Sequence, residues 1–249
     1  MKQVRVLLAE FLGTFGLVFF GAGAICADAV VRNGAAFGPA DLLAIAFAHA
    51  MILGVMVTAL GHVSGAHFNP AVTVGAAITR HIEPALAAMY VVTQLVAGVV
   101  AGFVLKYIFP GTITAAVQYG APTPAVDSVK AYVIEVMLTF FLVTVVFATA
   151  IDPRGAFNKI AGFAIGFVLL FDILLGGPLT GAAMNPARAF GPALVASVSG
   201  LSGVLDAKHF FIYWLGPVIG AAIAALVYQA ILLGEPESSD AQPSEAGDV

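Results

Sequence analysis

Two asparagines are the residues most clearly placed for chemistry, because each opens the same tripeptide. The tripeptides are Asn69, Pro70 and Ala71, and Asn185, Pro186 and Ala187. Only four asparagines occur in 249 residues, so chance explains the repetition poorly. Asparagine is a favoured N-cap, and proline suits the first helical position, where its missing N–H costs no hydrogen bond. Each tripeptide predicts a helix start with a side-chain amide that can donate hydrogen bonds.

Charged residues inside strongly apolar sequence form a second group. Arg188 directly follows the second tripeptide, and Glu10 and Glu135 lie within long apolar runs. A charge at membrane depth is costly and indicates function or a specific partner. Because the two glutamates occupy matching places in a repeat described below, we interpret them as hydrogen-bond acceptors for nearby backbone rather than as a proton relay.

Composition indicates the environment of these residues. Hydrophobic residues make up 61% of the chain and charged residues 10%, against about 25% charged in soluble proteins. So few charges cannot cover a water-facing surface, which predicts apolar side chains facing lipid. The net charge of −4 without a basic run argues against nucleic acid as a partner. The single cysteine, Cys26, excludes a disulfide framework, and we expect no metal or cofactor.

Apolar runs predict an all-α membrane protein with six transmembrane helices. Two shorter apolar stretches, 71–79 and 187–198, are too short to span and predict re-entrant half-helices, preceded by the irregular segments 61–68 and 176–184. The first run is longer than the core of a signal peptide. The predicted spans lie near 6–27, 42–61, 85–107, 130–151, 160–177 and 209–233.

The two halves of the chain, about 1–109 and 129–233, form an internal repeat. AEFLGTF at 9–15 matches IEVMLTF at 134–140, and SGAHFNPAVT at 64–73 matches TGAAMNPARA at 180–189. Three spans per half place the second half in the membrane upside down, so a pore or site is expected near the midplane. The channel domain is therefore predicted over 1–233, and the polar, acidic segment 234–249 is predicted to be a disordered tail.

The paired Asn-Pro-Ala motifs, the sequence NPARAFGPA and the two glutamate-containing helices resemble the aquaporin, or major intrinsic protein, family. The resemblance covers residues 1–233. It implies an hourglass fold, a homotetramer with one pore per subunit, and passive conduction of water with exclusion of protons and ions. Physical reasoning agrees, because opposed half-helices place two positive dipole ends at mid-membrane, where they repel cations.

The resemblance also assigns a selectivity filter, by spacing from the two asparagines, to His49, Ile173, Ala182 and Arg188. His67 is assigned to the inner vestibule. This filter departs from the strict water-channel pattern of Phe, His, Cys and Arg, and resembles that of the tonoplast-intrinsic type. A neutral histidine offers a donor and an acceptor. Ammonia is thus a further candidate solute, whereas glycerol is expected to pass poorly.

Three alternatives remain at this point. A glycerol or small-polyol facilitator is disfavoured because Ala189 stands where that branch usually carries Asp. A secondary transporter also uses inverted repeats, but its coupling carboxylates would have to be Glu10, Glu135 or Asp172. An enzyme is not expected, since no nucleophile–base or metal-ligand set is present. Lys and Arg are divided five to four between the two sides, which favours cytoplasmic termini; the membrane of residence is left open.

Overall fold

The computed structural model describes residues 2–154 and 160–233, and this part of the chain is helical. Six helices or helix groups are long and apolar enough to cross a membrane, as predicted: Gln3–Arg32, Pro39–Ser64, Pro84–Ile108, Ser128–Ile151, Ala161–Thr180 and Ala207–Leu232. The elements are α1 (Lys2–Arg32), α2 (Pro39–Ser64), α3 (Pro70–Ile78), α4 (Pro84–Ile108), α5 (Gly111–Ala116), η1 (Gln118–Gly120), α6 (Ser128–Val146), η2 (Phe147–Ile151), α7 (Ala161–Thr180), α8 (Pro186–Val198), α9 (Ala207–Phe210), η4 (Phe211–Leu215), α10 (Gly216–Val227) and η5 (Tyr228–Leu232). The predicted tail, 234–249, lies outside the described residues.

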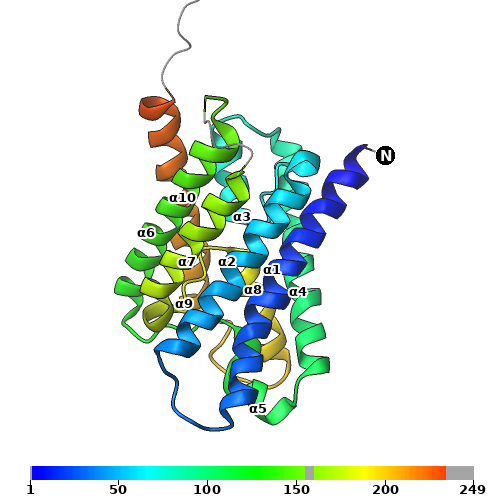
Figure 1. Ribbon diagram of the computed structural model, residues 1–249, viewed down its shortest axis with the longest axis vertical. Coiled ribbons are helices and arrows are strands. Elements are labelled where there is room, and N and C mark those ends of the chain that lie inside the picture. Colours follow the sequence, from blue (N-terminus) through cyan, green and yellow to red (C-terminus); the bar gives the residue numbers. More distant parts are fainter. Residues whose placement is uncertain (1, 155–159, 234–249) are drawn as a thin grey trace, which may run out of the picture.

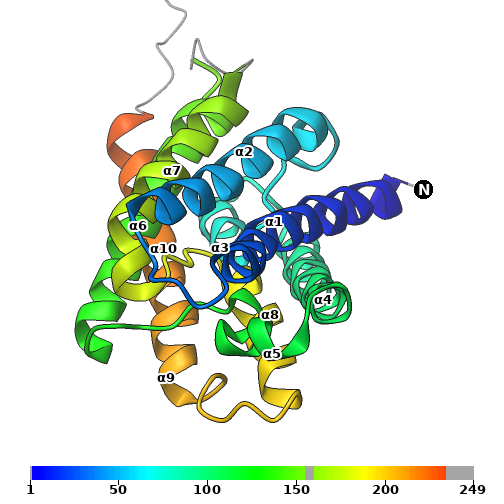
Figure 2. The same ribbon diagram turned by 60° about the horizontal axis from the view of Figure 1, so that its bottom comes forward.

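The helices form two groups with the short helices between them. Helices α1, α2 and α4 lie on one side, and α6, α7 and α10 lie on the other, with α3 and α8 between the groups (Figure 2). The start of α1 and the end of η5 lie at the same end of the bundle (Figure 1). This is the arrangement that six spans require, and it confirms the predicted all-α membrane fold.

The two helices that follow the asparagines are each too short to cross a membrane alone. Helix α3 has 9 residues and α8 has 13, which correspond to about 14 and 20 Å of helix. Asn69 and Asn185 are their N-caps, each accepting a hydrogen bond from the N–H of the alanine two residues later. Pro70 and Pro186 occupy the first helical position.

The irregular segments before the short helices are shorter than predicted. Helix α2 continues to Ser64 and α7 continues to Thr180. Each helix ends at a glycine in the left-handed region, Gly65 at φ 84° and Gly181 at φ 79°. Their N–H groups bond to carbonyl groups four residues earlier, which closes the last turn. The glycine-rich composition of these regions thus overestimated the irregular backbone.

Each half-helix packs against a long helix of the other half of the chain. A methyl group on Gly98 of α4 would lie 2.5 Å from Ala187 O of α8, and one on Gly75 of α3 would lie 3.3 Å from Ala221 O of α10. Backbone thus approaches backbone at both contacts. The two halves are interlocked, with neither short helix supported by its own half alone.

Candidate functional site

Asn69 and Asn185 meet at the centre of the molecule and lock the two halves together. Asn69 Nδ2 donates to Met184 O at 2.8 Å, and Asn185 Nδ2 donates to Phe68 O at 2.9 Å. Each bond therefore joins one motif to the loop before the other motif. An amide carries two N–H groups, so each asparagine keeps one donor that this bond does not use.

The first connecting loop is anchored by Glu10. Its carboxylate accepts from His67 N at 3.0 Å and Phe68 N at 2.7 Å. It also accepts from Ser64 Oγ at 2.7 Å and Gln94 Nε2 at 2.8 Å. Four donors surround a fully buried carboxylate, so the backbone that leads into α3 is fixed in place.

Glu135 does the same for the second loop. It accepts from Ala183 N at 2.9 Å and Met184 N at 2.7 Å, and from Thr180 Oγ1 at 2.7 Å. It is also fully buried. Unlike Glu10, it has no amide side chain among its donors in the part of the chain that the structure describes. The inverted repeat therefore extends to the hydrogen bonds of the two glutamates, apart from the one that Gln94 donates to Glu10.

Sequence reasoning missed several supporting residues. Gln94 is fully buried in α4 and also donates to Thr73 Oγ1 of α3 at 3.0 Å. Two tyrosines at matching repeat positions support the ends of α2 and α7: Tyr90 Oη donates to Ser64 O, and Tyr213 Oη donates to Thr180 O. The acceptors of both tyrosines are backbone carbonyls, which leave no signal in the sequence.

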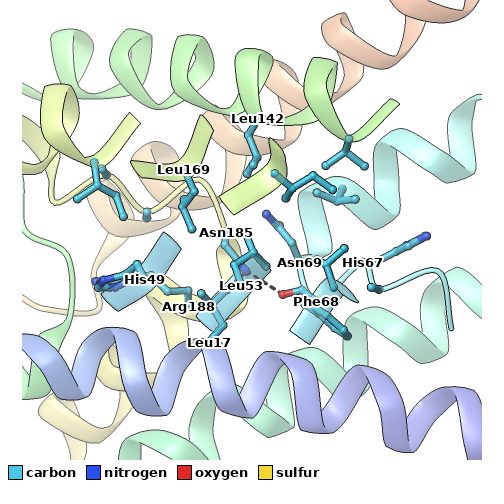
Figure 3. Close-up of a pocket in the computed structure, with 18 residues that line it drawn as sticks. Leu17, His49, Leu53, His67, Phe68, Asn69, Leu142, Leu169, Asn185 and Arg188 are labelled. Carbon is cyan, nitrogen blue, oxygen red and sulfur yellow. Dashed lines mark hydrogen bonds between the residues drawn. The ribbon is translucent and has the colours of Figure 1, made fainter. Parts of the chain in front are cut away.

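A narrow cavity runs through the centre, and it brings the predicted filter residues together. Figure 3 shows the residues that line this cavity. His49 and Arg188 lie near one end of it, His67 lies at the other end, and Asn69 and Asn185 lie between them. The space open to the centres of water-sized molecules is about 30 Å³. Its remaining wall is mostly apolar. The lining includes His49, Ile173, Ala182, Arg188, Leu17, Leu53, Val57, Leu142, Ile165 and Leu169.

His49 and Arg188 face each other in the wall of the central cavity, where a constriction was predicted. His49 Nδ1 lies 2.9 Å from Ile45 O, and His49 Nε2 lies 3.4 Å from Arg188 Nη2. A carbonyl only accepts, so Nδ1 carries the proton and Nε2 accepts from the guanidinium. Arg188 Nη1 donates to Gly120 O at 2.9 Å. The sequence suggested that His49 would offer a donor and an acceptor to solutes; here the protein itself uses both.

Wider spaces flank the narrow cavity. One, of about 460 Å³, is lined by His67, His81, Glu83 and Tyr90 and lies on the side of the chain ends. The other, of about 260 Å³, is lined by Gln118, Arg188 and neighbouring residues of the opposite side. Together with the narrow cavity they describe an hourglass.

Asp172 lies beside the site without joining it. Its side chain is on α7, next to Ile173, and is 6% exposed. Its Oδ2 atom has no hydrogen-bond partner among the described residues. Asp172 is also absent from the lining of the central cavity.

Asp152 directly follows η2, outside the membrane-spanning segments, and connects the end of η2 to the last helical turns, η5. Hydrogen bonds from the Arg154 side chain hold the pKa of the Asp152 carboxyl well below its usual range. Tyr228 Oη donates to the same carboxylate at 3.0 Å, and Arg154 Nη2 donates to Leu232 O at 2.8 Å. These contacts fix η5 beside the end of η2.

Comparisons with known proteins agree with this geometry. The family described as major intrinsic protein matches residues 1–228. A Zea mays protein named aquaporin TIP2-1 is 40% identical over 236 residues, covering 93% of this chain and 89% of its own. Aquaporin TIP1-2 of Zea mays is 42% identical over 232 residues, covering 93% and 87%. The structure of the Plasmodium falciparum aquaglyceroporin superposes with a TM-score of 0.80 at 23% identity, covering 92% of this chain and 97% of that one, which shows the shared fold. The resemblance seen in the sequence is thereby confirmed: this integral, multi-pass membrane protein belongs to the major intrinsic protein family.

Proposed function

We propose that the protein is a passive channel that conducts water in single file through the cavity between His49 and His67. One observation carries the proposal: the cavity is apolar along most of its wall and has amide donors from Asn69 and Asn185 at its centre. Apolar walls let water pass without strong binding, and the amides orient its oxygen. The names of the relatives, which are aquaporins, support the same activity.

Exclusion of protons and other cations follows from three fixed features. The N-termini of α3 and α8 point their positive ends at the centre of the pore. Arg188 adds a full charge at the constriction. A water held through its oxygen by the asparagine amides directs its hydrogens away from the centre, which interrupts a proton wire. We infer that cations, including protons, meet a barrier at the two asparagines and again at Arg188.

Osmotic shrinkage of proteoliposomes, without any ion gradient, tests the proposal. Fast shrinkage that does not saturate is expected, and a rate equal to that of empty vesicles would refute water conduction. A matched pair of substitutions on α7 locates the path. Ile173→Trp fills the constriction and should reduce the rate to that of empty vesicles. Leu175→Trp lies on the outward face, where the residue is 62% exposed, and should leave it unchanged.

Ammonia is the second solute that we propose, and the structure changes its justification. Both ring nitrogens of His49 are occupied by protein, so the case rests on width rather than on hydrogen bonding. Histidine is smaller than phenylalanine, and Ile173 and Ala182 are apolar or small. Glycerol needs several hydrogen-bonding groups that an apolar wall does not supply. A polyol facilitator is therefore disfavoured. An ion-coupled transporter is disfavoured because Glu10 and Glu135, two of its three candidate coupling carboxylates, are bonded to loop backbone.

Assembly and orientation complete the proposal. We infer a homotetramer in lipid, with both chain ends on the cytoplasmic side and one pore in each subunit. The function requires no cofactor, metal or chemical step, and no nucleic acid.

A further inference from the structure

Helix α1 passes directly behind the constriction, although it contributes none of the four predicted filter residues. Leu17 of α1 lines the central cavity. One turn later Gly21 has no side chain, and the imidazole of His49 occupies the space. A methyl carbon on Gly21 would lie 2.6 Å from His49 Nε2 and closer still to Cδ2. Carbon atoms never approach so closely, so any side chain at position 21 must displace the imidazole.

His49 has few directions in which to move. Its Nδ1 is tied to Ile45 O at 2.9 Å, and its Nε2 faces Arg188 Nη2 at 3.4 Å. The residue is 3% exposed. A push from α1 therefore moves the ring toward the pore centre or breaks its contact with Arg188. Both outcomes alter the constriction.

The next residue of α1, Ala22, acts on the position of Arg188 in the same indirect way, through the loop at Gly120. Ala22 contacts the loop at Gly120, where a methyl carbon would lie 2.7 Å from Ala22 Cβ and 2.7 Å from Ala22 O. Gly120 has a φ of 81°, a conformation that favours glycine. Its carbonyl accepts from Arg188 Nη1 at 2.9 Å. The close approach of this loop to α1 thus sets where the carbonyl holds the guanidinium.

We propose that the Gly21–Ala22 step of α1 sets the width of the constriction by positioning His49 and Arg188. Gly21 lets His49 withdraw from the pore, and Ala22 seats the loop that holds Arg188. These are positioning residues, since neither is proposed to touch a permeating molecule. The inference deepens the proposed function and rests on it.

Gly21→Ala is the test. Overpacking of this kind displaces the ring into the narrowest part of the pore, and we expect osmotic water permeability per reconstituted protein to fall about tenfold. Gly16→Ala on the same helix is the matched control, because its methyl carbon would lie 3.6 Å from Met56 Cγ, an ordinary contact. It should conduct like the wild type.

A double-substitution cycle separates positioning from general damage. In a His49→Ala background the ring is gone, so adding Gly21→Ala should change water permeability no further. A tenfold loss in both backgrounds would overturn the proposal, as would wild-type permeability in Gly21→Ala alone. If Gly21→Ala fails to accumulate but the double variant accumulates, the contact with His49 is again supported; failure of both overturns it. A wild-type protein that conducts no water would refute the proposed function instead.

Discussion

In the channel that we propose, Arg188 carries the charge of the constriction, and the loop at Gly120 and helix α2 hold its guanidinium. Gly120 O accepts from Nη1, and His49 Nε2 faces Nη2. Among the described residues no carboxylate forms an ion pair with it. The groups that hold the guanidinium are therefore neutral, and the proposed barrier to cations rests on this fixed positive charge.

Replacing Arg188 with valine should keep water flow while admitting protons and larger solutes. The substitution removes the fixed charge and widens the constriction at once. The measurement is a pair of rates in the same proteoliposomes, osmotic shrinkage and dye-reported proton leak. Unchanged solute selectivity and unchanged proton leak in Arg188→Val would remove Arg188 from the filter.

His49→Phe tests the width argument for ammonia. Phenylalanine is bulkier and cannot accept from Arg188, so we expect ammonia flow to fall while water flow continues. Internal alkalinisation after an ammonium jump reports ammonia entry in wild type and variant. If both proteins alkalinise no faster than empty vesicles while water flow stays high, the channel conducts water and not ammonia.

At the scale of the elements, the contact between α4 and α8 positions the second motif. Gly98 lets α4 approach the first turn of α8, where Ala187 O lies against it. Gly98→Ala should lower stability by about 1–3 kcal/mol, because backbone rather than a flexible side chain resists the added methyl group. Thermal unfolding in detergent measures the change. Gly111→Ala is the control, since a methyl group there meets nothing within 4 Å; equal unfolding midpoints would contradict the prediction.

The elements show what the sequence could and could not predict. Apolar run length predicted all six spans, and Asn-Pro predicted both short helices, because these signals are local. The ends of α2 and α7 were misplaced, since glycine composition does not reveal which glycine adopts a left-handed conformation. Gly65 and Gly181 do so only where the chain must turn into a short helix.

Contacts made by backbone were beyond the sequence altogether. Gly120 O accepts a hydrogen bond from Arg188, and Met184 O accepts one from Asn69. Because every residue has a carbonyl group, the sequence does not indicate which one is the acceptor. The predicted filter residues did come together around one cavity, because the family resemblance placed them by spacing. The contact of His49 Nε2 with Arg188 depends on the distance between α2 and α8, which no spacing in the sequence encodes.

For the whole molecule, the outward faces of both helix groups are apolar. Exposed large side chains include Leu8, Phe20, Phe47 and Val55 on α1 and α2, and Met137, Phe141, Phe163 and Phe171 on α6 and α7. Two different faces permit a head-to-tail contact that closes into a ring. With the four subunits that the family resemblance implies, native mass spectrometry from mild detergent should show a species of about four times the 25.5 kDa chain. A monomer with full water permeability would show that assembly is not needed for the pore.

The crossed hydrogen bonds at the centre also impose an order in time. Asn69 and its acceptor, Met184 O, are separated by 115 residues. At ordinary rates of synthesis a ribosome needs roughly 10 s to cover that distance. During this interval the first motif exists without its lock, and its amide and the loop before it must find other hydrogen-bond partners. The hydrogen bonds of the newly made first half therefore stay incomplete, and water or the insertion machinery must supply partners until the second half is synthesised.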